Sequence, residues 1–163
     1  MDEKIVVLLS GGLDSSTLLD YVQKEMGLTP LPVFFDREQG NREAELSAAN
    51  KVCEMLNIQL HTVSIRDWRR SVPPDVHMED IPRNAIMIFL AIPYAIAYSC
   101  SAIAIGSNMD DGGMRDSSKE FVDACNNLLQ VVTPGIAVIA PFLEKNMKKS
   151  DVAAWAYKNC GID

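Results

Sequence analysis

Length, composition and charge already exclude several classes of protein. The chain has 163 residues and 48% of them are hydrophobic, so we expect one compact domain over residues 1–163 with a sizeable core, and not a disordered chain. The formal net charge of −7 argues against nonspecific binding to nucleic acid, which requires clustered cations.

No segment favours a membrane span. The apolar run in residues 5–9 is too short for the core of a signal peptide. The longest apolar stretch, residues 85–106, approaches transmembrane length but contains Pro93, Tyr94 and Tyr98, so we interpret it as a buried helix followed by a buried strand. The cysteines are far apart and form no CxxC pair, which favours reduced thiols in a cytoplasmic protein. They are Cys53, Cys100, Cys125 and Cys160.

The first half of the chain alternates predicted strands with predicted helices. Its opening apolar run ends at a glycine turn, which is typical of a buried parallel strand. Two later segments place apolar residues at helical spacing among good helix formers. We expect strands over residues 4–10, 29–36 and 60–65, helices over 15–26 and 41–58, and a long functional loop over 66–82.

The second half repeats the alternation. We expect helices over residues 83–99, 119–132 and 149–161, the last closed by Gly161, strands over 102–107 and 137–143, and a polar loop over 108–118. Strands that alternate with helices throughout predict a doubly wound α/β fold, with a mainly parallel sheet and helices on both faces.

Polar segments follow the first four predicted strands. They read SGGLDSS (10–16), DREQGN (36–41), the proline-rich loop 66–82 and SNMDDGG (107–113). Ligands of such sheets bind beyond the carboxyl ends of the strands, and these four loops all lie at that edge. Their convergence favours a nucleotide site.

The SGGLDSS segment has the chemistry of a phosphate-binding turn. Glycine lets a ligand approach the main chain, serine hydroxyls and free N–H groups donate hydrogen bonds, and a helix that starts near Ser15 favours an anion. The alternative is an ordinary turn between strand and helix, capped by Asp14, with no ligand.

This segment resembles the PP-loop of the ATP pyrophosphatases, enzymes that adenylate a substrate and release pyrophosphate. It differs from the GxxxxGK[ST] P-loop because no lysine ends it. The residues that match are Ser10, Gly11, Gly12, Asp14, Ser15 and Ser16.

Further segments resemble the 7-cyano-7-deazaguanine synthases over nearly the whole chain. Two departures concern the site: Arg37 and Glu38 replace a usual Tyr-Gly, and Ser117 and Ser118 replace a Cys-Arg pair. The matching residues are Asp36, Gln39, Glu45, Arg83, Asn84, Gly106, Asn108, Asp110, Asp116, Glu120, Phe121, Lys149 and Asp151.

The resemblance implies an ATP-dependent ligase with Mg²⁺ as cofactor. Its small-molecule substrate would be 7-carboxy-7-deazaguanine, whose carboxylate is adenylated so that ammonia forms the amide, and a second ATP leads to the nitrile. Arg83, Asp110 and Lys149 are the expected catalytic residues. The expected nucleotide-binding residues are Ser10, Gly11, Gly12, Leu13, Asp14, Ser15, Ser16, Phe35, Asp36, Gln39, Asn84, Gly106 and Asn108.

Several of these roles have a plain structural alternative. Asp14 would contact Mg²⁺ or cap its own turn, and Asp110 and Asp111 would bind Mg²⁺ or form a solvated turn. Arg83 suits a phosphate or a carboxylate, because a cation at a helix start is a poor match for the helix dipole. Lys149 would contact phosphate or face solvent.

The metal expectation is Mg²⁺ without zinc. Members of the resembled family continue into a cysteine-rich tail that holds zinc, whereas this sequence stops at Asp163 and Cys160 alone does not make a four-cysteine site. A partner chain or a homodimer remains open. So do two other functions: a related enzyme with another acceptor, by amidation or tRNA thiolation, and a module that binds adenine nucleotide without turnover.

Overall fold

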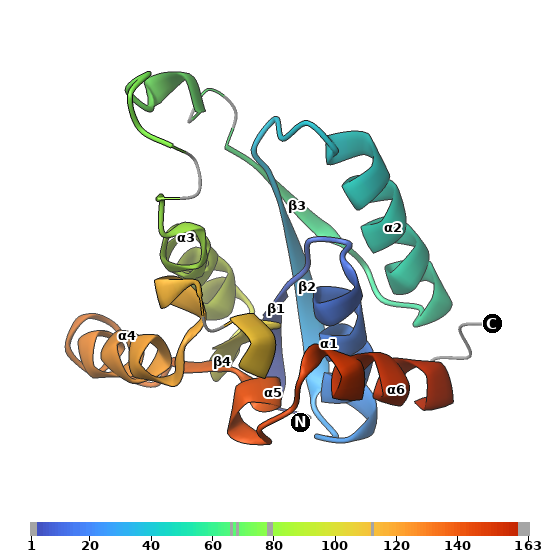
Figure 1. Ribbon diagram of the computed structural model, residues 1–163. Coiled ribbons are helices and arrows are strands. Elements are labelled where there is room, and N and C mark those ends of the chain that lie inside the picture. The colour runs from blue at the N-terminus through green and yellow to red at the C-terminus, as the bar shows by residue number, and fades with distance from the viewer. Residues whose placement is uncertain (1–2, 66, 68, 78–79, 112, 160–163) are drawn as a thin grey trace.

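The structure, a computed structural model, describes residues 3–65, 67, 69–77, 80–111 and 113–159. Five strands form one parallel sheet in the order β3-β2-β1-β4-β5 (Figure 1). The strands are β1 (Lys4–Leu8), β2 (Thr29–Asp36), β3 (His61–Ser64), β4 (Ala102–Ala104) and β5 (Ala137–Ile139). The helices are α1 (Leu13–Lys24), α2 (Arg42–Met55), α3 (Arg83–Ala97), α4 (Lys119–Val132), α5 (Pro141–Glu144) and α6 (Lys149–Asn159), with single turns η1 (Arg69–Ser71), η2 (Met109–Asp111) and η3 (Arg115–Ser117).

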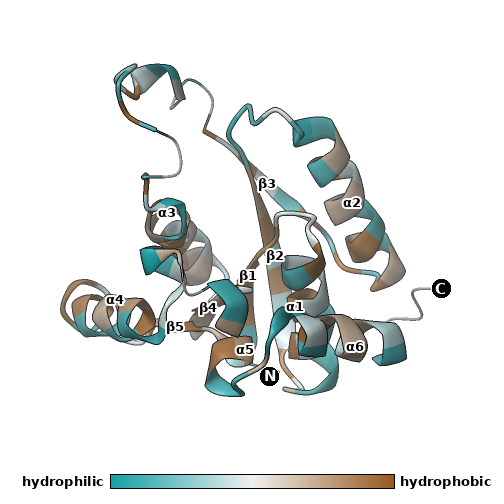
Figure 2. Ribbon diagram, in the orientation of Figure 1, coloured by the Kyte–Doolittle hydropathy of each residue, from teal (hydrophilic) through white to brown (hydrophobic). Residues whose placement is uncertain are grey.

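Helices cover both faces of the sheet, so the predicted doubly wound α/β fold is confirmed. Successive residues of β1 point to opposite faces. Val6 packs with residues of α3 and α4, whereas Ile5 and Val7 pack with residues of α1, α2 and α6. Both faces of this central strand are therefore buried, and this explains why its sequence is an unbroken apolar run. Figure 2 shows both hydrophobic and hydrophilic colouring along α2 and α4, in keeping with helices that bury one side.

β2 is a strand although it begins Thr-Pro-Leu-Pro. The Thr29 N–H donates to the Glu3 carbonyl on the β1 side, at 2.9 Å. Pro30 and Pro32 therefore turn their nitrogens to the other side, where β3 has not begun, because β3 pairs only with Val33–Asp36. No ladder donor is lost at either proline, which is the condition for proline within a sheet.

Most elements differ by one to four residues from the sequence prediction at one end or both, and two of the differences concern particular residues. The expected strand over 137–143 ends at Ile139, because Pro141 cannot donate to a ladder and instead occupies the first turn of α5. α1 begins at Leu13, two residues before the expected start. Gly161, expected to close the last helix, lies outside the described residues. Within the described part of the chain, no helix is long and apolar enough to cross a membrane.

Candidate active site

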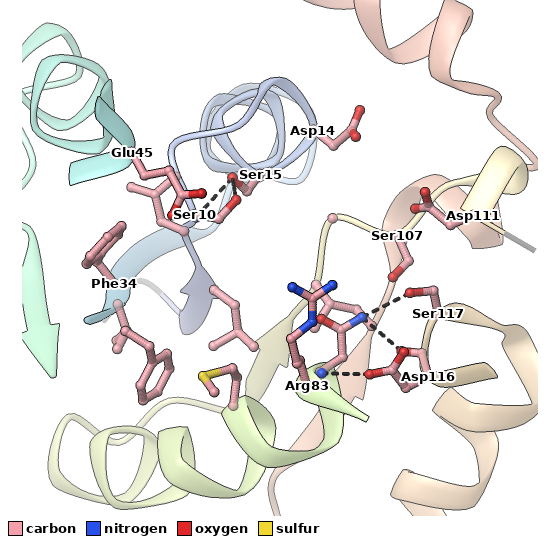
Figure 3. Close-up of a pocket in the computed structure, with 18 of the residues that line it drawn as sticks. Ser10, Asp14, Ser15, Phe34, Glu45, Arg83, Ser107, Asp111, Asp116 and Ser117 are labelled. Carbon is pink, nitrogen blue, oxygen red and sulfur yellow. Dashed lines mark hydrogen bonds between the residues drawn. The ribbon is translucent and has the colours of Figure 1, made fainter. Parts of the chain in front are cut away.

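The site lies where the chain changes direction across the sheet. After β1 the chain continues to β2 and β3 on one side, and later returns to β4 and β5 on the other. The carboxyl ends of β1 and β4 thus flank the point where doubly wound sheets bind ligands. A cavity of about 370 Å³ opens there (Figure 3), within the size range of small-molecule sites. Its floor is apolar, and its polar rim comes from the loops after β1, β2 and β4 and from the start of α3.

The turn between β1 and α1 holds two serine hydroxyls together. The Ser10 N–H donates to Ser15 Oγ at 3.1 Å, the two hydroxyl oxygens lie 3.0 Å apart, and the Ser15 hydroxyl donates to the Gly12 carbonyl at 3.2 Å. Gly12 is the N-cap of α1 and provides no side-chain cap. The first N–H groups of the helix therefore have no side-chain acceptor at this cap, which is the arrangement that receives a phosphate.

Two glycines of the site serve the protein's own packing. Gly11 has a φ of +78°, and a Cβ there would lie 2.1 Å from the Glu45 carbonyl oxygen of α2. A Cβ on Gly106 would lie 3.2 Å from the backbone of Asp14. Both glycines let backbone segments meet closely, and so bring Glu45 and the start of α1 to the cavity. The sequence suggested a different use, in which the glycines make room for the ligand itself.

Asp14 is placed for charge chemistry and not for capping. It lies in the first turn of α1, with Lys149 Nζ 3.7 Å from its Oδ2 and with Oδ1 buried without a hydrogen-bond partner in the described part of the chain. Burial raises the pKa of the Asp14 carboxyl; the Lys149 charge opposes this and the Asp111 charge adds to it. Asp14 and Asp111 both line the cavity.

These two carboxylates fit a divalent cation. A cation between them would offset their repulsion and give the buried Asp14 Oδ1 a partner, and Mg²⁺ prefers one or two carboxylates together with phosphate oxygens.

The neighbouring acidic residue, Asp110, connects η2 to α6. Its Oδ2 accepts from the Lys149 N–H at the start of α6, at 2.9 Å. Asn108 is fully buried; its N–H donates to Asp111 Oδ2 at 3.0 Å and its Oδ1 accepts from the Asp110 N–H at 2.9 Å. Asn108 therefore shapes η2 and fixes the position of Asp111. Asp110 is exposed and is not among the residues that line the cavity.

The wall opposite the PP-loop is built on the start of α3. Arg83 is the first residue of the helix and lines the cavity (Figure 3). Asn84 donates from its side chain to the Asp116 carbonyl at 2.9 Å and to Ser117 Oγ at 3.0 Å, while its N–H donates to Asp116 Oδ2 at 2.7 Å. Asn84 thus joins α3 to η3, and Asp116 provides the negative charge that the helix start favours.

The loop after β2 is ordered by its own side chains. Asp36 is buried, and its carboxylate pairs with Arg42 at 2.8 Å and accepts from the Glu38 N–H at 3.2 Å. The Gln39 side chain accepts from the Arg37 N–H at 2.9 Å and donates to Glu45 Oε2 at 2.7 Å. These contacts present Arg37, Gln39 and Glu45 to the cavity, whereas Asp36 stays beneath it.

The structure brings about half of the expected site residues to the cavity surface. Sequence reasoning gave no role to Arg37, although its charge directly after a strand end was a signal. The expected residues that line the cavity are Ser10, Asp14, Ser15, Phe35, Gln39, Arg83, Asn84 and Gly106. Those that lie beside or beneath it are Gly11, Gly12, Leu13, Ser16, Asp36, Asn108, Asp110 and Lys149.

The described cysteines offer no metal site or nucleophile at the cavity. Cys53, Cys100 and Cys125 are buried with free thiols, and burial raises the pKa of Cys53 to about 11. No group of three or more His, Cys, Asp or Glu side chains among the described residues is arranged to hold a metal ion. Cys160 lies outside the described residues.

Solved structures show the same fold. The U34-tRNA thiolase NcsA from Methanococcus maripaludis has a TM-score of 0.71 and 20% identity, with 96% of this chain and 57% of the thiolase covered. The NH₃-dependent NAD synthetase from Campylobacter jejuni has a TM-score of 0.64 and 18% identity, with 97% of this chain and 64% of the synthetase covered. This chain thus spans less than two thirds of either protein, and the likeness concerns the fold.

Sequence comparisons are more specific. A 7-cyano-7-deazaguanine synthase from Trichodesmium erythraeum is 33% identical, with 91% of this chain and 78% of the relative covered. The synthase from Methylobacillus flagellatus is also 33% identical and matches 100% of this chain and 79% of its own length. The family model described as queuosine biosynthesis protein QueC matches residues 4–161. The chain therefore belongs to the QueC family.

Proposed function

We propose that this protein is an ATP-dependent carbon–nitrogen ligase that converts 7-carboxy-7-deazaguanine to 7-cyano-7-deazaguanine, with ammonia as the nitrogen donor. The observation that carries this proposal is the pairing of two features across one cavity. The PP-loop serines and the uncapped start of α1 lie on one wall, and Arg83 lies on the other. The family relationship to 7-cyano-7-deazaguanine synthases supplies the identity of the acid.

The chemistry overcomes the low reactivity of a carboxylate. A carboxylate oxygen attacks the α-phosphorus of ATP, the bond to the β-phosphate bridging oxygen breaks, and pyrophosphate leaves. Ammonia then attacks the acyl carbon, AMP leaves, and loss of a proton gives the amide. A second ATP activates the amide oxygen in the same way, with release of pyrophosphate, and the nitrile forms as that oxygen departs with AMP and the amide nitrogen gives up its two protons.

The protein's residues contribute position and charge. We assign the pyrophosphate to the N–H groups and hydroxyls around Ser10 and Ser15, and the reacting carboxylate or α-phosphate to Arg83. Lys149 lies close to Asp14 and would add positive charge beside the leaving phosphates. Because the groups are already in place before reaction, little reorganisation is needed as charge develops.

Mg²⁺ is the metal that we assign to Asp14 and Asp111, with Asp110 as a further candidate outside the cavity lining. When bound, it would neutralise the phosphate oxygens. We further infer that ATP, the deazapurine acid and ammonia are the only small molecules that the reaction consumes.

The direct test is conversion by the purified chain. The protein is incubated with ATP, Mg²⁺, ammonium and 7-carboxy-7-deazaguanine, and pyrophosphate release and the mass of the products are followed. We expect the amide and the nitrile. Arg83→Ala should reduce the rate of pyrophosphate release roughly 10- to 150-fold, the loss expected for one charge-assisted contact, without unfolding the protein.

Two outcomes separate the other functions that the sequence left open. ATP binding without any adenylate, amide or nitrile would show that the acid is wrong and would favour another acceptor. ATP binding with no pyrophosphate release from a panel of carboxylic acids would favour a non-catalytic nucleotide-binding module.

A further inference from the structure

Arg37 is the cavity residue without an explained role. It follows directly after β2, where the resembled family has tyrosine, and it lines the cavity beside Gln39 and Glu45. It is half-buried, and its backbone is fixed because its N–H donates to Gln39 Oε1 at 2.9 Å. A guanidinium so far out of water is costly unless its five donors find acceptors.

Arg37 shares the cavity with a second guanidinium. Arg83 lines the same cavity from α3. Burial lowers the pKa of Arg37, the positive charge of Arg83 lowers it further, and the negative charge of Glu45 opposes both effects. Among the described residues, neither guanidinium has a carboxylate oxygen within 4.0 Å or donates a hydrogen bond. Two unpaired cations that line one cavity repel each other, and an anion bound within reach of both would relieve that repulsion.

The cavity also indicates which anion this is. The PP-loop and the start of α1 already form a phosphate site on their own wall, so the phosphates of a nucleotide do not need Arg37. Apolar side chains line the same cavity, including Val33, Phe35 and Met87. Apolar lining together with two guanidinium forks suits a flat ring that carries a carboxylate.

We propose that Arg37 binds the carboxylate of the acid substrate together with Arg83, and so makes the cavity select an acid over a neutral ring of the same shape. This inference rests on the proposed function for the identity of the ring. The carboxylate loses its charge on adenylation, so Arg37 contributes to binding of the acid more than to the chemical step. Its removal should therefore raise KM for the acid and leave kcat nearly unchanged.

Isothermal titration calorimetry with two probes tests this assignment. The probes are 7-carboxy-7-deazaguanine and the uncharged 7-cyano-7-deazaguanine, which differ at the group that Arg37 would contact. Arg37→Gln should weaken binding of the acid roughly 10- to 150-fold and leave binding of the nitrile within about 3-fold. Arg37→Lys should recover only part of the affinity, because lysine presents a point charge and not a fork. ATP affinity should not change.

The matched control is Arg70→Gln. It removes the same charge from a side chain that is 78% exposed and paired with Asp67 outside the cavity, so it reports any effect of net charge alone. The melting temperatures of Arg37→Gln, Arg37→Lys and Arg70→Gln are measured as well. Values equal to that of the wild type would show that lost affinity does not come from unfolding.

The outcomes distinguish this inference from the proposed function. Suppose that the wild type makes the nitrile. If Arg37→Gln then binds the acid as tightly as the wild type does, or loses affinity for the acid and the nitrile by the same factor, the role of Arg37 is wrong while the function stands. If the wild type binds the acid in an Arg37-dependent way yet makes no product, the function is wrong while the anion site stands. A wild type that binds neither probe overturns both.

Discussion

Replacing Gly11 by alanine should destabilise the protein through two separate effects. Alanine at a φ of +78° costs about 1–2 kcal/mol, because the left-handed region disfavours a Cβ. The new Cβ would also lie 2.1 Å from the Glu45 carbonyl oxygen, 1.3 Å short of the 3.4 Å at which ordinary contact begins. Since that oxygen belongs to the backbone of α2, the helix must shift, and overpacking of this kind typically costs about 1–3 kcal/mol.

The sum predicts a loss of about 2–5 kcal/mol in the free energy of unfolding, measured from the urea midpoint. For a chain of this size it corresponds to a fall of roughly 4–20 °C in Tm. Gly27→Ala is the matched control, because Gly27 has a φ of +65° and, apart from its two chain neighbours, no described residue has an atom within 4 Å of the place that the new methyl group would take. It should cost only the backbone term, about 1–2 kcal/mol. Equal costs for the two variants would refute the reasoning from the α2 contact.

Three further predictions concern Asp14 and Asn84, on opposite walls of the cavity, and Cys53 in the core. Because burial raises the pKa of Asp14 above its ordinary 3.8, the free energy of unfolding of the ligand-free protein falls as the pH rises from the unfolded to the folded pKa. Asp14→Asn should therefore raise Tm at pH 7 but not below pH 3.8, and a lower Tm at pH 7 would contradict this. Asn84→Ala removes two side-chain donors, to Asp116 and Ser117, and should cost about 1–3 kcal/mol in urea unfolding; an unchanged midpoint would show that these contacts are dispensable. Burial raises the pKa of Cys53 to about 11, so this thiol, with 2% exposure, should react with iodoacetamide at pH 8 roughly 100-fold more slowly than in urea, as followed by mass spectrometry of its peptide; comparable rates would refute its burial.

The sequence was most informative where one periodicity decided the outcome. The helix over 119–132 and the strand over 29–36 have the predicted bounds, because apolar spacing is regular in the first and the β-forming run Val33–Phe35 follows the two prolines of the second. Pro141 shows where the reasoning was too coarse: apolar character suggested that the strand continued, but a missing N–H ended it. A pattern of residue types locates elements better than it locates their ends.

The site was predicted less completely, because tertiary contacts decide what each polar residue does. Asp110 and Asp111 are adjacent and have the same type of side chain. Asp110 accepts a hydrogen bond from the first residue of α6, whereas Asp111 lines the cavity. Gly11 was correctly identified as a place where something approaches the main chain, but the approaching group is α2. Arg37 was noticed only as a departure from a family pattern, since its neighbour Arg83 comes from 46 positions further along the chain.

The position of the cavity also has a consequence for how the protein opens. β1 forms five residue pairs with β2 but only three with β4. The pairing between β1 and β4 is therefore the weaker of the two, and it lies at the boundary where the ligand would bind. α6 contacts both sides of this boundary: its Lys149 N–H donates to Asp110 in the loop after β4, at 2.9 Å, and its Trp155 packs against Tyr21 of α1 with ring centroids 5.1 Å apart. A partial opening that separates β1 from β4 must therefore release α6 as well, and a ligand held by both walls opposes it. Amide hydrogens of β1 and β4 should exchange more slowly in the complex, those of α6 with them, while the β2–β3 edge keeps its own rate.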